Sequence, residues 1–304
     1  MSTGPPTCCA ANVARVDENV ALSRFTTIGT GGPARWFARP ETLDDLVAAL
    51  RWARERGVAV ETVGLGSNLL AHDAGVEALV LKLGGELASV GVDGDLLVAG
   101  GGAANAVCLH RARTAGLGGF EFASAIPGTA GGGVCMNAGA YGREWRDVVV
   151  DAVVVDADGP RTVGVEDLGL AYRRSGLAPG TVVAEVRFRL DESSPEAIKR
   201  TVGELLAQRK ATQPTNKRTF GSVFKNPGDG PGAGRLIEEC GLKGMRIGGA
   251  LISPRHANFI ENAGGATSEE CLALMAEARR AVFERFGVEL EHEVRFFGPL
   301  ELPA

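Results

Sequence analysis

Glycine constrains the fold of this chain more than any other residue, because it is abundant and gathered into clusters. There are 43 glycines among 304 residues, concentrated at 29–32, 64–66, 100–102, 128–133 and 228–234. The clusters follow neither the three-residue period of collagen nor the serine-rich composition of a flexible linker. They therefore predict ordered turns, some of which need a positive φ angle or bring the backbone close to a ligand.

The hydrophobic pattern predicts strands and helices between these clusters. Up to residue 190 we expect helices over 40–57 and 103–115 and strands over 58–63, 78–83, 95–99, 148–155 and 181–190. Ser194 and Pro195 are typical of a helix start and mark a boundary. Beyond it we expect helices over 232–240 and 268–286 and strands over 249–252 and 288–297. Capping boxes are expected at Thr42 with Asp45 and at Thr267 with Glu270.

Composition narrows the function classes. The net charge is only −5 and no Lys/Arg-rich block stands out, which disfavours a nucleic-acid partner. No apolar run approaches the roughly 20 residues that span a bilayer, and residues 1–20 do not resemble a secretory signal. The six cysteines form no CxxC pair, so we expect no metal site, and we place the protein in the reducing cytoplasm.

Two glycine-rich segments are candidates for ligand binding. Neither 29–32 nor 64–66 completes GxGxxG, so an ordinary Rossmann site is excluded. The stretch GLGSN at 64–68 follows a predicted strand, and its backbone N–H groups could approach a pyrophosphate; the alternative is a tight structural turn. The nearly uncharged segment 121–142 suits backbone lying against a large flat ligand, and the alternative is a buried glycine-rich loop.

Seven motifs, taken in order, resemble the UDP-N-acetylenolpyruvoylglucosamine reductase family. The likeness runs from about residue 25 to residue 298. The motifs are TIGTGG at 27–32, GSNLL at 66–70, IPGT at 126–129, NAGAYG at 137–142, YRRS at 172–175, GSVFKNP at 221–227 and EVR at 293–295.

The resemblance implies an α+β fold in two parts. An N-terminal tail over 1–20 precedes an FAD-binding domain of the vanillyl-alcohol oxidase (PCMH) type, with two α+β subdomains, over 21–192. A smaller α+β substrate-binding domain follows over 193–304. The missing GxGxxG is expected in this family. None of the four histidines lies in the glycine-rich flavin segment, so we expect non-covalent FAD. The implied FAD-binding residues are Gly64, Gly66, Ser67, Asn68, Leu69, Pro127, Gly128, Thr129, Gly132, Asn137, Gly139, Ala140 and Tyr141.

The resemblance also implies a reaction of peptidoglycan precursor synthesis. NADPH reduces FAD, and the flavin N5 then passes hydride to the enolpyruvyl ether of UDP-N-acetylglucosamine enolpyruvate, which becomes UDP-N-acetylmuramate. Ser222 matches the family's proton donor, although taken alone it would be a turn serine. Arg173 matches the residue that steadies the substrate carboxylate or enolate, with Arg174 as the competitor on spacing. Glu293 matches the third catalytic residue, although its parity places it on a solvated strand face.

The remaining expectations concern the substrate side. Lys225 and Asn226 are expected to hold the UDP pyrophosphate, and Tyr141 to sit where flavin meets substrate, with Arg209 and His256 as weaker candidates. The chain resembles the shorter form of the family, which lacks an extra tyrosine loop, and residues 213–218 are our candidate cover. We expect a monomer. The alternatives are another flavin oxidoreductase on the same scaffold, or an inactive FAD-binding homologue.

Overall fold

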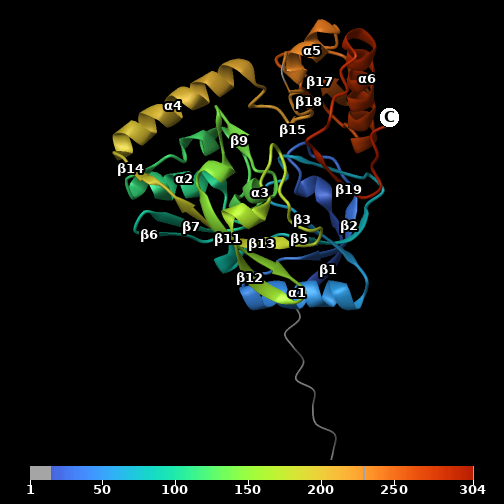
Figure 1. The fold of residues 1–304 in the computed structure, drawn as a ribbon. Helices are drawn as coiled ribbons and strands as arrows, with labels where there is room; N and C mark the ends of the chain where they lie inside the picture. The colour runs from blue at the N-terminus through green and yellow to red at the C-terminus, as the bar shows by residue number, and fades with distance from the viewer. Residues whose placement is uncertain (1–14, 229, 304) are drawn as a thin grey trace, which may run out of the picture.

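The computed structural model describes residues 15–228 and 230–303. Helices occur together with sheets whose strands pair mostly antiparallel, so the α+β class is confirmed (Figure 1). Most predicted elements are present within a few residues of their expected bounds. The helices are α1 (Leu43–Glu55), α2 (Asn105–Thr114), α3 (Ala130–Cys135), α4 (Pro195–Thr212), α5 (Ala233–Glu239) and α6 (Ser268–Phe286). Short 3-10 turns lie at η1 (Leu22–Arg24), η2 (Gly85–Ala88), η3 (Glu121–Ala125), η4 (Trp145–Asp147) and η5 (Val165–Leu168).

A mixed four-stranded sheet lies near the N-terminus. Its order is β1 (Val16–Ala21), β2 (Pro33–Ala38), β5 (Val76–Leu81) and β3 (Ala59–Thr62), with only the β1–β2 pair antiparallel. The first of these strands begins within residues 1–20, the range expected for the N-terminal tail. Helix α1 packs its buried face, which includes Leu46, Ala49 and Leu50, against this sheet and against the next one.

An antiparallel five-stranded sheet forms the largest core. Its order is β12 (Gly159–Gly164), β11 (Val149–Asp156), β13 (Val182–Arg189), β7 (Leu96–Gly100) and β6 (Val90–Asp93). Trp145 is fully buried there and meets the rings of Phe120, Phe122 and Phe188 with centroids 5.4, 5.5 and 6.2 Å away. Two small pairs border this sheet, β9 (Gly139–Ala140) with β10 (Arg143–Glu144) and β8 (Leu117–Gly118) with β14 (Asp191–Glu192).

The glycine-rich helix α3 was not expected from the sequence. Thr129 caps it by accepting a hydrogen bond from the Gly132 N–H at 3.3 Å. A Cβ at Gly133 would lie 2.2 Å from the ring of Trp145, so glycine is required there for packing rather than for a ligand. The low helix propensity of glycine is offset by this cap and by packing against the sheet.

A third sheet lies in the second half of the chain. It runs β15 (Thr219–Ser222), β18 (Phe259–Asn262), β17 (Ala250–Ile252) and β16 (Arg246–Ile247), all antiparallel, with α5 and α6 beside it. Helix α6 has the predicted capping box, and its Glu270 carboxylate also accepts a hydrogen bond from the Gly249 N–H at 2.9 Å. The cap therefore fixes the helix start against this sheet.

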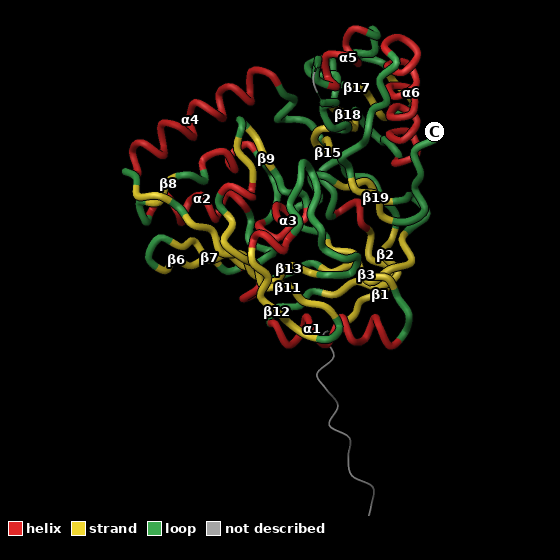
Figure 2. Tube along the Cα trace, in the orientation of Figure 1, coloured by secondary structure: helices red, strands yellow, loops and turns green. Residues whose placement is uncertain are grey.

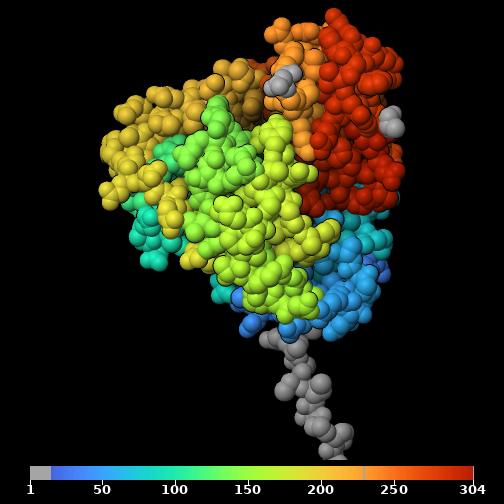
Figure 3. Space-filling model, in the orientation of Figure 1, coloured from blue at the N-terminus to red at the C-terminus, as the bar shows by residue number. Residues whose placement is uncertain are grey.

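The end of the chain returns to the N-terminal half. The strand expected over 288–297 is present only as β19 (Arg295–Phe297), which pairs in parallel with β4 (Leu69–Ala71). Residues 288–294 instead form an extended segment with one isolated bridge, between His292 and Phe224. The C-terminal residues consequently lie directly on the N-terminal ones (Figure 3), and loops gather around α3 in the centre (Figure 2). In the described part of the chain, no helix is long and apolar enough to span a membrane.

Candidate active site

A cavity of about 620 Å³ lies where these loops converge. Its wall is drawn from the loop between β3 and β4, the segment 125–141, the segment 173–181, the end of α4, the end of β15 and the extended segment that leads into β19. Residues far apart in sequence thus share one cavity, and six of the seven motifs contribute to its wall.

One wall is built from two glycine-rich loops. The Ser67 hydroxyl donates to the Pro127 carbonyl, and a Cβ at Gly64 would lie 2.8 Å from the Thr129 hydroxyl, so the loops touch. Gly66 has φ +65, and a Cβ there would lie 1.9 Å from the Phe25 carbonyl oxygen. No side chain fits at this position.

This wall offers free backbone donors. The N–H groups of Leu65, Gly66, Ser67 and Asn68 donate to no acceptor within the residues that the structure describes. Successive unpaired N–H groups form a concave site for an anion such as a pyrophosphate. The Lys82 ammonium adds a positive charge by donating to the Gly64 carbonyl at 2.6 Å. The wall therefore fits the diphosphate of FAD.

Nearly all the residues expected to bind FAD line this cavity. They are Gly64, Gly66, Ser67, Asn68, Leu69, Pro127, Gly128, Thr129, Gly132, Gly139, Ala140 and Tyr141.

Asn137 is the exception, because the structure places it behind the wall. Its amide nitrogen donates to the Ala171 carbonyl at 3.1 Å, and its side-chain oxygen accepts from the Arg146 N–H at 3.0 Å. The residue is fully buried, with φ +38. Both polar groups of its side chain thus hold the neighbouring loops together, and its contact with FAD stays a prediction.

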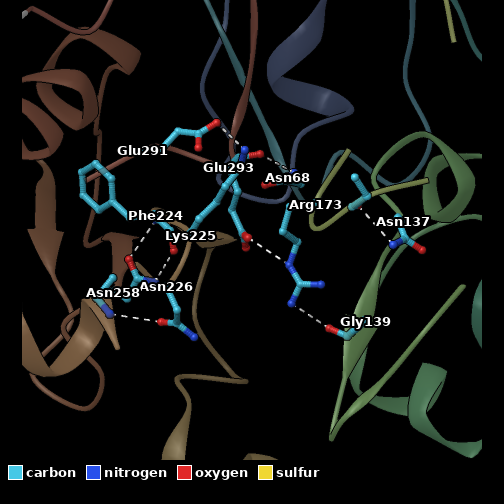
Figure 4. Close-up of polar contacts among 12 residues, drawn as sticks. Asn68, Asn137, Gly139, Arg173, Phe224, Lys225, Asn226, Asn258, Glu291 and Glu293 are labelled. Atoms are coloured by element: carbon cyan, nitrogen blue, oxygen red, sulfur yellow. Dashed lines mark hydrogen bonds and ion pairs between the residues drawn. The ribbon is translucent and has the colours of Figure 1, made fainter. Parts of the chain in front are cut away.

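Arg173 and Glu293 form an ion pair in the cavity wall (Figure 4). The Arg173 Nε lies 3.1 Å from the Glu293 carboxylate, and another guanidinium nitrogen donates to the Gly139 carbonyl at 2.9 Å. The two side chains are 23% and 15% exposed. Arg173, which has φ +58, therefore joins the loop at Gly139 to the Glu293 carboxylate. Arg174 is exposed and lies outside the cavity wall.

Glu293 is held from both sides by its backbone. Its carbonyl accepts from the Asn68 amide at 2.8 Å, and its N–H donates to the Val223 carbonyl at 2.9 Å. Burial raises the pKa of the Glu293 carboxyl, while Arg173 and Lys225 act in the opposite direction. The solvated face expected from strand parity was wrong, because the strand begins only two residues later.

Ser222 ends β15 in the cavity wall, next to Gly221. Within the described residues its hydroxyl makes no hydrogen bond to protein, so it is free to meet a ligand. A half-buried, unpaired hydroxyl beside a carboxylate and a guanidinium is a suitable position for a proton donor.

The residues expected on the substrate pyrophosphate are placed differently. Lys225 and Asn226 do not line the cavity. The Lys225 ammonium pairs with the exposed Glu291 carboxylate, and the Asn226 side-chain oxygen accepts from the Ala233 N–H at 3.0 Å, at the start of α5. In this arrangement both side chains have protein partners, and their contact with the substrate pyrophosphate stays a prediction.

Tyr141 lies in the cavity wall as expected, and its hydroxyl donates to the Leu205 carbonyl of α4 at 2.9 Å. His256 lies outside the wall. Its ring packs on Phe259, and its pKa is lowered by burial and then by Lys243.

Sequence reasoning missed several polar residues of the wall. Burial, and then Arg39, lower the pKa of Lys82. Burial raises the pKa of Glu61, which lies 3.4 Å from the Arg295 guanidinium. Their only sequence signal was a charged side chain inside an otherwise apolar strand or motif. Among the described residues there is no cluster of His, Cys, Asp or Glu that could hold a metal.

Comparison with known proteins decides the family. The chain is 47% identical over 281 residues to the UDP-N-acetylenolpyruvoylglucosamine reductase of Anaeromyxobacter dehalogenans (strain 2CP-C), covering 92% of this chain and 85% of the relative. The chain belongs to the UDP-N-acetylenolpyruvoylglucosamine reductase family. The family's C-terminal domain model matches residues 213–297, and an FAD binding domain model matches residues 34–163.

Other members of the reductase family agree over nearly the full length. The reductase of Rubrobacter xylanophilus is 42% identical over 294 residues, covering 94% of this chain and 95% of the relative. The crystal structure of the reductase (MurB) from Thermus caldophilus superposes with a TM-score of 0.82 at 38% identity, covering 93% of this chain and 99% of that one. The reductase fold is therefore shared from end to end.

Proposed function

We propose that this protein reduces UDP-N-acetylglucosamine enolpyruvate to UDP-N-acetylmuramate, using NADPH and non-covalent FAD, for peptidoglycan synthesis in the cytoplasm. The name of its relatives supports the reaction. The observation that carries it is the meeting of Arg173, Glu293 and Ser222 in one cavity with the FAD-type loop. We assign FAD binding to the domain that ends near residue 192 and substrate binding to the domain that follows, and we expect a monomer.

FAD held by the loops 64–69 and 127–129 would, once reduced by NADPH, supply hydride for the enolpyruvyl double bond. The Arg173 guanidinium offers forked donors that orient the substrate carboxylate and stabilise the negative charge that develops on it. Its position is fixed by the Gly139 carbonyl and by Glu293.

The neighbouring carbon then takes a proton. The Ser222 hydroxyl delivers it, and the strongly basic enolate carbon makes this weak acid sufficient. Glu293, whose pKa is raised by burial, stands beside this step and orients or reprotonates the reacting groups. No other role is assigned to it.

The test is NADPH oxidation at 340 nm by the purified FAD-loaded protein, with and without UDP-N-acetylglucosamine enolpyruvate. We expect substrate-dependent oxidation that falls by about 10²–10⁴-fold in Ser222→Ala, the usual contribution of a positioned acid. Ser23→Ala, outside the cavity wall, is the matched control. Flavin reduction by NADPH without substrate should survive in Ser222→Ala. FAD-loaded wild type that oxidises no NADPH in response to substrate refutes the proposal.

A further inference from the structure

Helix α4 reaches the cavity wall only at its C-terminal end. Of its residues only Ile198 is buried. Its later turns are tied to the rest of the protein by the Tyr141 hydroxyl on the Leu205 carbonyl and by the Arg255 guanidinium on the Lys210 carbonyl at 2.7 Å. Between these two contacts, Arg209 enters the cavity wall together with Gln213. The helix therefore presents one guanidinium to the cavity.

Arg209 differs from the other positively charged side chains of the cavity wall in its partners. In the described part of the chain, the lysine and arginine side chains in the wall are Lys82, Arg173, Arg209 and Arg295. Arg173 pairs with the Glu293 carboxylate and Arg295 with the Glu61 carboxylate. The Lys82 ammonium donates a hydrogen bond to the Gly64 carbonyl. Arg209 faces no carboxylate.

The surroundings of Arg209 leave its charge uncompensated. Its Nε donates to the neutral Gln213 side chain at 3.2 Å, and its other guanidinium nitrogens meet no acceptor among the described residues. Burial lowers the pKa of Arg209, with only Tyr141 acting in the opposite direction. Because a guanidinium does not lose its proton in proteins, its partly buried charge is stabilised when an anion binds.

The available anions point to a nucleotide diphosphate. The substrate carboxylate is met by Arg173, and the FAD diphosphate by the loop with free N–H groups, so neither needs Arg209. The side chains of Lys225 and Asn226 are occupied elsewhere. Both the UDP-sugar and NADPH bring a further diphosphate into the cavity, and Arg209 stands on the side of the wall that includes Tyr141 and Gln213.

We propose that Arg209 binds the diphosphate of the nucleotide that enters beside α4, in the UDP-sugar or in the nicotinamide dinucleotide. This inference rests on the proposed function. A planar guanidinium with free donors is well suited to phosphate oxygens, and Arg209 lies in the last turn of α4 at the cavity wall.

Calorimetric titration of the oxidised, FAD-loaded protein with UDP, uridine and NADP⁺ tests the assignment. We expect Arg209→Met to bind UDP, NADP⁺ or both about 10- to 100-fold more weakly, as for loss of a charged hydrogen bond. Binding of uridine, which lacks the diphosphate, should be unchanged. Arg200→Met removes an exposed arginine from the same helix and should bind every ligand like wild type.

Each outcome decides a different point. If Arg209→Met binds only UDP more weakly, Arg209 contacts the sugar nucleotide. If it binds only NADP⁺ more weakly, Arg209 contacts the dinucleotide. Weaker binding of both ligands indicates a shared subsite. Wild-type affinity for both in Arg209→Met overturns the assignment. Should Arg209→Met lose FAD, Arg209→Lys, which keeps the charge, must retain part of the diphosphate affinity or the assignment fails. A wild type without substrate-dependent turnover refutes the proposed function instead, whatever the variant binds.

Discussion

The ion pair between Arg173 and Glu293 leads to a prediction about stability and pH. Both side chains are largely shielded from solvent, at 23% and 15% exposed. A neighbouring arginine stabilises a carboxylate by about 1.4–4 kcal/mol. Because Arg173 is partly exposed and Lys225 remains nearby, we expect Arg173→Met to lower the free energy of unfolding by about 1.5–2.5 kcal/mol at neutral pH.

The sign of the pH dependence follows from the raised pKa of Glu293. Its carboxyl keeps a proton to higher pH in the folded state than in the unfolded state. Its contribution to stability is therefore fully present below the unfolded pKa of 4.5 and is lost as pH rises through the folded pKa. Removing Arg173 raises the folded pKa further, so the variant loses more stability over a wider window. Wild type and variant should differ little near pH 4.5 and most at neutral pH.

Urea unfolding of the FAD-loaded protein at pH 5 and pH 8 measures this difference. Arg174→Met, a change of the exposed neighbour, should have little effect at either pH. Methionine has a side chain beyond Cβ like arginine, so the strained φ of +58 at position 173 is common to both proteins. An equal loss of stability at both pH values, or a larger loss at pH 5, would show that charge pairing is not the cause.

Three further substitutions test the cavity and the core. Lys82→Met removes a charged hydrogen bond to the Gly64 carbonyl, so we expect FAD to bind about 10-fold more weakly. Fluorescence titration of the apoprotein with FAD measures this, and an unchanged Kd contradicts it. Gly66→Ala puts a Cβ 1.9 Å from the Phe25 carbonyl oxygen and adds about 1–2 kcal/mol of φ strain. Both Tm and FAD content should therefore fall. Wild-type values of both would be inconsistent with the loop geometry. Trp145→Ala empties the centre of the largest core and should cost about 3–5 kcal/mol in urea unfolding; a loss below 1 kcal/mol, on the order of one buried methylene, would mean that the site collapses.

Helix ends were the most predictable part of the fold, because the residues that make them are local. Thr42 and Asp45 form the expected capping box of α1, with hydrogen bonds of 3.1 Å in both directions. Gly287 ends α6 in the left-handed region, at φ +67. Such contacts span only a few residues and can be read directly from the sequence.

The glycine-rich segment around α3 shows what local reasoning leaves out. Gly133 resembles a ligand-contact glycine in sequence, but its missing side chain makes room for Trp145. Only the tertiary position of that ring distinguishes the two explanations. Lys82 and Arg209 were overlooked or ranked low for the same reason, since a cavity assembled from distant segments leaves no periodic signal.

The catalytic residues were found by resemblance rather than by pattern. Parity along residues 288–297 placed Glu293 in solvent, whereas the extended segment turns it toward Arg173. Motif order named Arg173, Ser222 and Glu293, and all three line one cavity. It did not foresee that Lys225 and Asn226 hold protein partners, because a motif carries identity but not hydrogen-bond geometry.

The pairing of β19 with β4 imposes an order on biosynthesis. The hydrogen bond from Asn68 to Glu293 joins residues 225 positions apart, so a nascent chain contains the glycine-rich FAD loop long before the segment that completes its cavity. Such long-range contacts form late and slowly. The Glu293 carboxylate therefore joins this loop only after the last strand, β19, has been translated. A ribosome-bound fragment that ends before residue 293 therefore contains the glycine-rich FAD loop but lacks the Glu293 carboxylate that pairs with Arg173.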